Sequence, residues 1–235
     1  MIALSSQTIV VTGAAQGLGA AIARHLSAQG ARLFLMDRHA DALATTQAQC
    51  PGAIALTVDL SDATATAAAI AQLPAAVDTL IHNAAILRVE AVDATSLATF
   101  QATLNVGIQA AFQLTQALWP QMKARGGTLI FVSSRSGIEG FENETAYCAA
   151  KHALEGFSKC LAMEGAAHGI ASYTITPGML MHTPMSETTY GAEQRARWVD
   201  PIRLAPAFAH LAQMRPMQLS GQRLDAWALS TGADT

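Results

Sequence analysis

Short apolar runs rich in β-branched residues alternate along the chain with longer segments in which apolar residues recur every three or four positions. The short runs are typical of buried strands, and the longer segments are typical of amphipathic helices. Strands are predicted at residues 8–12, 31–36, 53–58, 79–82, 128–132, 170–176 and 223–229. Helices are predicted at about residues 20–29, 41–49, 62 onward, 96–122 and 144–154. This alternation predicts an α/β fold, a doubly wound parallel sheet of about seven strands with helices on both faces.

The composition fits a single domain, residues 1–235, because no linker or change of pattern divides the chain. Charged residues make up only 13% of the sequence, against a usual share of about 25%. So few charges favour buried contacts between subunits, and we expect a homo-oligomer, either a tetramer or a dimer. The net charge of -3 and the pI near 6.1 provide no basic surface for nucleic acid or for a membrane.

The cysteines and the first residues indicate the compartment. Cys50, Cys148 and Cys160 are odd in number and lack CxxC spacing, which argues against a disulfide framework and against a zinc site. The chain begins with no positively charged leader, and no apolar run reaches the ~18 residues of a membrane span. We therefore expect a cytoplasmic protein that binds no metal.

A glycine-rich turn separates the first predicted strand from the first predicted helix. Gly13, Gly17 and Gly19 let the backbone turn sharply and approach a pyrophosphate, and the free amides at the helix start favour its negative charge. Strand, glycine turn and helix follow in the order that a dinucleotide site requires. The spacing differs from G-x-G-x-x-G, and glycines alone would also make a plain tight turn, but the flanking elements favour the nucleotide interpretation.

A carboxylate at the end of the second strand indicates which cofactor is bound. Asp37 lies about 20 residues beyond the glycines, where it can accept hydrogen bonds from the adenosine ribose. The same charge would repel a 2′-phosphate, and the turn offers Gln16 rather than a cation, so NAD is favoured over NADP. Two alternatives remain open: Arg38 would soften the repulsion, and Asp37 would serve only as a helix cap.

The ends of the third and fourth strands carry further candidate cofactor contacts. Asp59 either binds the adenine edge, with Leu60 beside the ring, or helps to start the helix near Asp62. Asn83 and Ala84 are small enough to let backbone lie against a ribose.

Two polar residues stand in apolar surroundings. His82 is expected to pack or cap rather than to catalyse. Asn105 lies in an otherwise apolar helical segment, so its amide should bond to backbone or to an ordered water.

A hydroxyl, a phenol and an ammonium occur together between residues 134 and 151. Tyr147 and Lys151 lie four residues apart in a helix-forming segment and therefore share one helical face. A cation beside a phenol lowers the phenol pKa from its ordinary value near 10, which makes Tyr147 a proton donor and acceptor. Ser134 follows a predicted strand, and ligands of an open parallel sheet bind beyond the carboxyl ends of its strands. Taken alone, a Tyr-x-x-x-Lys pair is more often structural.

The least regular stretch lies between Gly178 and Pro201, where methionine and tryptophan stand among polar residues. Such side chains adapt to irregular apolar ligands, so residues 178–200 are interpreted as a mobile substrate lid. A surface loop with a small core of its own is the alternative. An at least partly apolar substrate is indicated by the candidate contacts, which besides Ser134 and Tyr147 are Ile138, Phe141, Met179, Leu180, Met185 and Trp198.

Together these motifs resemble the classical short-chain dehydrogenase/reductase (SDR) family over essentially the whole chain. The sequence TGAAQGLG at residues 12–19 is similar to the cofactor signature of that family, and Pro177-Gly178 is similar to the turn after its sixth strand. The residues that occur in the order of its catalytic tetrad are Asn105, Ser134, Tyr147 and Lys151. The resemblance implies a Rossmann-like fold and an NAD-dependent oxidoreductase that interconverts a secondary alcohol and a ketone. An NADP-dependent carbonyl or 3-oxoacyl reductase and a non-catalytic nucleotide sensor remain alternatives.

The resemblance also implies roles for individual residues. Tyr147 would be the general acid and base, and Ser134 would polarise the substrate oxygen. Lys151 would bind the nicotinamide ribose and lower the tyrosine pKa, and Asn105 would hold a water in a proton relay. The implied cofactor contacts are Gly13, Gln16, Gly17, Leu18, Gly19, Asp37, Asp59, Leu60, Asn83, Ala84, Tyr147, Lys151, Pro177, Gly178 and Thr183. The chain departs from the family pattern at His82-Asn83-Ala84-Ala85, at Thr183 and in the tail LSGQRLDAWAL.

Overall fold

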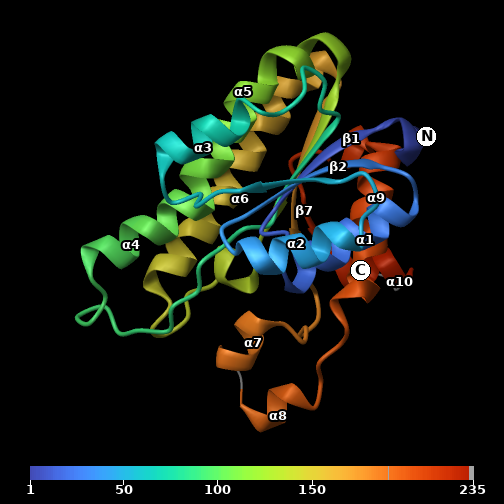
Figure 1. The fold of residues 1–235 in the computed structure, drawn as a ribbon. Coiled ribbons are helices and arrows are strands. Elements are labelled where there is room, and N and C mark those ends of the chain that lie inside the picture. Colours follow the sequence, from blue (N-terminus) through green and yellow to red (C-terminus); the bar gives the residue numbers. More distant parts are fainter. Residues whose placement is uncertain (190, 233–235) are drawn as a thin grey trace.

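The computed structural model describes residues 1–189 and 191–232, and it is organised around one parallel sheet with helices on both faces (Figure 1). The strand order is β3-β2-β1-β4-β5-β6-β7, and every neighbouring pair is parallel. The order reverses between β1 and β4, and ligands of such sheets bind outside the carboxyl ends of the strands at this point. The predicted doubly wound α/β fold is therefore confirmed. The strands are β1 (Thr8–Thr12), β2 (Arg32–Asp37), β3 (Ile54–Thr57), β4 (Thr79–His82), β5 (Gly127–Val132), β6 (Ile170–Thr176) and β7 (Arg223–Asp225).

Two apolar layers hold the helices on the sheet. One layer packs α1 and α9 against it, with Leu26 and Phe208 buried, and the other packs α5 and α6, with Leu114 and Leu154 buried. Because both faces are covered, the strands are apolar throughout, and runs rather than alternation marked them in the sequence. The helices are α1 (Gly17–Ala28), α2 (Ala40–Ala48), α3 (Ala63–Ile70), α4 (Leu97–Leu104), α5 (Ala110–Arg125), α6 (Thr145–Gly165), α7 (Pro184–Thr189), α8 (Ala192–Arg195), α9 (Ala205–Met214) and α10 (Ala226–Thr231).

The predicted seventh strand is much shorter in the structure. Residues 223–229 were expected to be extended, but β7 ends at Asp225 and α10 begins at Ala226. The Asp225 carboxylate accepts a hydrogen bond from the Ala228 amide at 2.9 Å and so caps the new helix. The prediction was wrong beyond Asp225 because the apolar residues 226–229 looked like the continuation of a strand, whereas the cap starts a helix.

The long helix predicted over residues 96–122 is interrupted. A π-helical turn, Asn105–Gln109, separates α4 from α5. Gly107 in this turn lies so close to α6 that an added Cβ would be 2.8 Å from the Ala150 Cβ. Turns of this kind occur frequently at functional sites. The turn brings the Asn105 segment against the helix that carries Tyr147.

The cysteines Cys50, Cys148 and Cys160 carry free thiols. Among the helices of the described residues, none combines the length and the apolar character that a membrane crossing requires. Over the same residues there is no cluster of histidine, cysteine, aspartate and glutamate suited to a metal ion.

Candidate active site

The glycine turn after β1 leaves no room for side chains. Gly13 and Gly17 have φ values of +65° and +55°, in the left-handed region that favours glycine. A Cβ on Gly19 would collide with the carbonyl oxygen of Gly13. Gln16 is exposed and Leu18 is buried beneath the turn. The first amides of α1 follow this turn, and free amides at a helix start favour the negative charge of a pyrophosphate.

Asp37 is fixed beside this turn at the end of β2. Its Oδ2 accepts a hydrogen bond from the Ala15 amide at 3.1 Å, and its Oδ1 accepts one from the His39 amide at 3.0 Å. The residue that caps α2 is His39, so the helix-cap alternative for Asp37 does not hold. The carboxylate faces the glycine turn, where the ribose interpretation requires it.

The turn after β4 is fastened to the glycine turn. The Thr12 hydroxyl oxygen accepts hydrogen bonds from the amides of Asn83 at 3.1 Å and Ala84 at 3.0 Å. Asn83 Nδ2 donates to the carbonyl oxygens of Thr12 and Gly13, both at 3.1 Å. These contacts join the ends of β1 and β4 at the point where the strand order reverses. Thr12 begins the TGAAQGLG signature, but the contacts of its hydroxyl were not predicted.

His82 is completely buried and connects this junction with the π-helical turn. Its Nδ1 lies 3.1 Å from the Thr12 hydroxyl, and its Nε2 lies 3.0 Å from the carbonyl oxygens of both Val106 and Gly107. Since only Nε2–H can donate to carbonyls, Nδ1 accepts from Thr12 and the ring is neutral. Burial and then the charge of Lys151 lower the pKa of His82 to about 4. The expected packing role is confirmed.

Asp59 and Asp62 have separate tasks. Asp62 caps α3 by accepting hydrogen bonds from Thr64 and Ala65 amides. The Asp59 carboxylate accepts from the Ser61 amide at 2.9 Å, and this backbone hydrogen bond is the main cause that lowers its pKa. The start of α3 therefore belongs to Asp62, while Asp59 closes the preceding turn and stays exposed, with Leu60 buried next to it.

Asn105 has the backbone partner expected of it. Its Nδ2 donates to the Ser61 carbonyl oxygen at 3.0 Å. The side chain therefore ties the turn after β3 to the π-helical turn.

Lys151 joins α6 to the end of β5. Only 2% of the residue is exposed, and its Nζ donates to the Val132 carbonyl oxygen at 2.6 Å. The same Nζ lies 5.4 Å from the centre of the Tyr147 ring, one helical turn earlier. Burial lowers the pKa of Lys151 to about 8, against the opposing charge of Glu155. The predicted phenol and ammonium are therefore neighbours. The ammonium is anchored at Val132, two residues before Ser134.

Ser134 begins a 3-10 turn, Arg135–Gly137, that is attached to the start of α6. Its Oγ accepts a hydrogen bond from the Ser136 amide at 3.2 Å. Ser136 Oγ in turn donates to the carboxylate of Glu144 at 3.0 Å, and Glu144 immediately precedes α6. Ser134 and Tyr147 are both half-buried. These contacts hold the predicted serine against the helix that carries the tyrosine.

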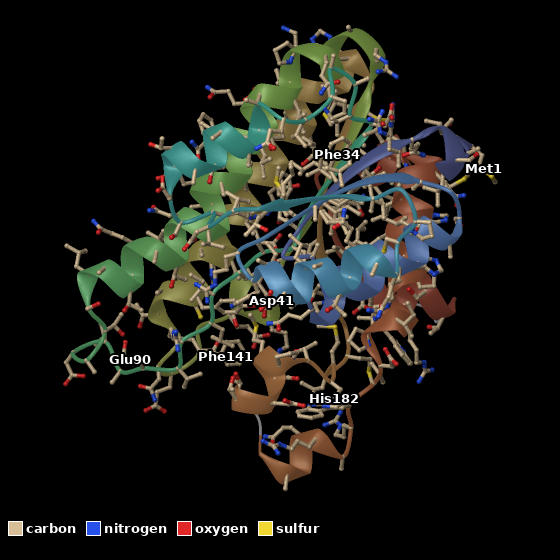
Figure 2. All side chains as sticks on the ribbon, viewed as in Figure 1. Met1, Phe34, Asp41, Glu90, Phe141 and His182 are labelled. Atoms are coloured by element: carbon tan, nitrogen blue, oxygen red, sulfur yellow. The ribbon has the colours of Figure 1, made fainter. Side chains whose placement is uncertain are left out.

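The segment that follows β6, residues 178–189 and 191–200, extends away from the sheet as α7 and α8 (Figure 1). Thr183 lies over the glycine turn, because a Cβ on Gly17 would be 3.2 Å from the Thr183 Cγ2. Trp198 stacks on His182 with ring centres 4.8 Å apart, so this side chain packs inside the segment itself. Figure 2 shows His182 and Phe141 at the same end of the molecule.

The remaining predicted residues border this end of the sheet. Ile138 and Phe141 lie in the loop between β5 and α6. Pro177-Gly178, Met179 and Leu180 follow β6, and Met185 lies in α7. A Cβ on Gly178 would collide with the Asp225 carboxylate, which requires glycine there.

The chain is similar to known proteins over most of its length. The family model described as short chain dehydrogenase matches residues 7–194, so β7 lies beyond the matched range. L-xylulose reductase from Bos taurus is 31% identical over 196 residues, covering 83% of this chain and 80% of that protein. A solved structure of a short chain dehydrogenase/reductase family protein has a TM-score of 0.87 at 28% identity and covers 98% of this chain and 100% of that chain. The actinorhodin polyketide ketoreductase solved with NADPH has a TM-score of 0.84 at 26% identity, covering 98% of this chain and 100% of that chain.

Proposed function

Because the chain belongs to the short-chain dehydrogenase family, whose members are NAD(P)-dependent oxidoreductases, we propose that it interconverts a secondary alcohol and a ketone with NAD. The observation that carries the proposal is the position of Lys151. Its buried ammonium lies beside the Tyr147 ring and is hydrogen-bonded to the strand end that leads to Ser134.

In the proposed oxidation, Tyr147 takes the proton of the substrate hydroxyl while Ser134 donates a hydrogen bond to the same oxygen. The charge of Lys151 favours the phenolate form of Tyr147, which is the form that accepts a proton. The bound nicotinamide supplies the hydride acceptor. Asn105 would contribute to proton relay through atoms other than Nδ2, which is engaged with Ser61.

The glycine turn, Asp37, the Asn83-Ala84 turn and Thr183 would hold the cofactor, with Lys151 toward the nicotinamide ribose. Gln16, Leu18, Asp59, Leu60, Pro177 and Gly178 complete the proposed set. The fit is supported by the tight glycine turn, in which a Cβ on Gly13 or Gly19 would collide with Asn83 Nδ2, and by the free amides at the start of α1, which favour a pyrophosphate.

NAD is proposed over NADP because the Asp37 carboxylate is held at the glycine turn, although a similar structure contains NADPH. Replacing Asp37 with alanine is expected to shift the ratio of kcat/KM values toward NADP by about 10- to 100-fold, because a repulsive charge is removed. Steady-state kinetics with each cofactor measures the ratio. Asp41→Ala, a change of an exposed carboxylate in α2, is the control and should leave the ratio unchanged. The same ratio in Asp37→Ala as in the unmodified protein would contradict the assignment.

The proposed function is tested by mixing the protein with NAD and secondary alcohols while nicotinamide absorbance is followed. The panel should include short polyols, because L-xylulose reductase is a similar protein, and apolar alcohols, because the apolar residues Met179, Leu180 and Met185 follow the carboxyl end of β6. We propose that residues 178–200 close over the substrate as a lid. Absence of turnover with every alcohol and ketone at every pH would favour the nucleotide sensor instead.

The protein is further proposed to be a cytoplasmic homo-oligomer. Large apolar side chains on three helices remain exposed in the single chain, namely Leu97, Phe112 and Met163. The free thiols fit a reducing compartment. A mass in solution equal to the 24.5 kDa of one chain would contradict the oligomer.

A further inference from the structure

Three successive residues at the end of β5 are each held by a charged side chain from another element. The three contacts are Lys151 Nζ to Val132 O at 2.6 Å, Ser133 Oγ to Glu155 Oε1 at 2.5 Å, and Arg223 Nη2 to Ser134 O at 3.2 Å. The lysine and the glutamate come from α6, and the arginine comes from β7. The strand end that leads to the predicted catalytic serine is thus held at three consecutive residues, through the backbone carbonyls of Val132 and Ser134 and through the Ser133 hydroxyl.

Glu155 is the centre of this arrangement. Its side chain is 8% exposed, and Oε2 accepts a hydrogen bond from the Thr174 hydroxyl at 2.6 Å. Arg223 Nε lies 3.3 Å from Oε1, which places a positive charge next to the buried carboxylate. A Cβ on Gly137 would be only 3.2 Å from Oε1, so the turn after Ser134 packs directly on this carboxylate. A buried carboxylate is tolerated only with such partners.

The sheet register delivers Arg223 to this place. Thr174 in β6 is paired with Arg223 in β7, so the two residues that contact Glu155 are neighbours across the strands. Strand β7 contains only three residues, and its first one reaches both Glu155 and the Ser134 carbonyl. The short seventh strand therefore connects the C-terminal segment with the proposed active site.

We propose that Arg223 is a positioning residue for the proposed reaction, which acts through Glu155 and the Ser134 carbonyl to fix the serine turn against Lys151 and Tyr147. The inference rests on the proposed function. Arg223 contacts the Glu155 carboxylate and the Ser134 carbonyl oxygen, and no role in contacting the substrate or the cofactor is assigned to it.

Glu155 also acts on the charge of Lys151, one helical turn away. Burial lowers the pKa of Lys151 to about 8, and the Glu155 charge works in the opposite direction. The other groups that face this ammonium are the Tyr147 ring on α6 and the neutral His82 on β4, while Arg223 on β7 partly neutralises Glu155. Removing the Glu155 charge should therefore lower the titration midpoint of Lys151, and removing Arg223 should raise it.

Kinetics provides the first test. In Arg223→Gln, kcat is expected to fall about 10- to 100-fold, because a small displacement of a group at the reacting centre has effects of this size. NAD affinity, measured by equilibrium binding, should change little, and Arg223→Lys should recover part of kcat because the charge returns without the forked geometry. Arg203→Gln is the matched control, since this exposed arginine stacks on Trp227 outside the site.

A titration of Lys151 provides the second test and needs no substrate. The chain contains only three lysines, so carbon-13 labelling of their side chains gives few NMR signals, with Lys123 and Lys159 as internal references. Opposite shifts of the Lys151 midpoint, downward in Glu155→Gln and upward in Arg223→Gln, would support the proposal. Mere loosening of the fold would expose Lys151 and move its midpoint upward in both variants, and that result would overturn the proposal. An unchanged kcat together with unchanged midpoints would also overturn it. Absence of turnover in the unmodified protein would refute the proposed function alone, because the midpoints are read without it.

Discussion

Replacing Tyr147 with phenylalanine is expected to lower turnover by about two to four orders of magnitude, the usual contribution of a positioned proton donor and acceptor. The substitution keeps the ring beside Lys151 and removes only the hydroxyl that exchanges a proton with the substrate. NAD should still bind, because the glycine turn and Asp37 are untouched. Turnover numbers and equilibrium binding of NAD, measured on the same preparations, separate loss of chemistry from loss of cofactor.

Tyr173→Phe is the matched control for this substitution. Tyr173 is fully buried in β6 and donates to the Pro216 carbonyl oxygen at 3.1 Å, away from the proposed site. Loss of this hydrogen bond should cost about 1 kcal/mol of the free energy of unfolding and leave kcat within a small factor. Retained turnover in Tyr147→Phe would refute the assigned proton transfer, whatever the control shows.

The free energy of unfolding is expected to fall by roughly 2–3 kcal/mol between pH 7 and pH 4.5 because of His82 alone. The pKa of this buried ring is lowered to about 4 in the folded protein, from an ordinary value of 6.5. Between these two values the unfolded chain binds a proton that the folded chain excludes. The contribution is therefore present above pH 6.5 and is lost as the pH falls toward 4.

Chemical denaturation followed by circular dichroism at several pH values measures this effect. Other carboxylates also titrate in this range, so the comparison must be made with His82→Gln, whose stability should depend less on pH than that of the unmodified protein. His168→Gln, which changes an exposed histidine, should show the unmodified dependence. Equal slopes for the unmodified protein and His82→Gln would contradict the neutral, buried state of His82.

Protonation of His82 at low pH should also disturb the contacts of the glycine turn. Neutral His82 accepts from the Thr12 hydroxyl, and the same oxygen holds the amides of Asn83 and Ala84. A protonated ring could no longer accept at Nδ1. One titratable group therefore links the glycine turn, the turn after β4 and the π-helical turn.

Local sequence determined the positions of the strands and most helices, since short apolar runs rich in β-branched residues are typical of strands in a sheet that is covered on both faces. It also determined the glycine turn, because bare backbone at Gly13 and Gly19 can be read directly from residue type. The four-residue spacing of Tyr147 and Lys151 predicted their contact for the same reason: neighbours on one helix are fixed by its period.

The tertiary structure decided whatever depends on contacts between distant segments. No sequence pattern indicated the position of Arg223. Its partners lie at the end of β5 and in α6, and they meet Arg223 only through the register of β6 and β7. The π-helical turn at Asn105 and the end of β7 at Asp225 likewise followed from packing and capping, which compete locally with periodicity. Helical and strand periods specify each element by itself, but the charged side chains that fix the Ser134 backbone become neighbours only when the sheet has assembled.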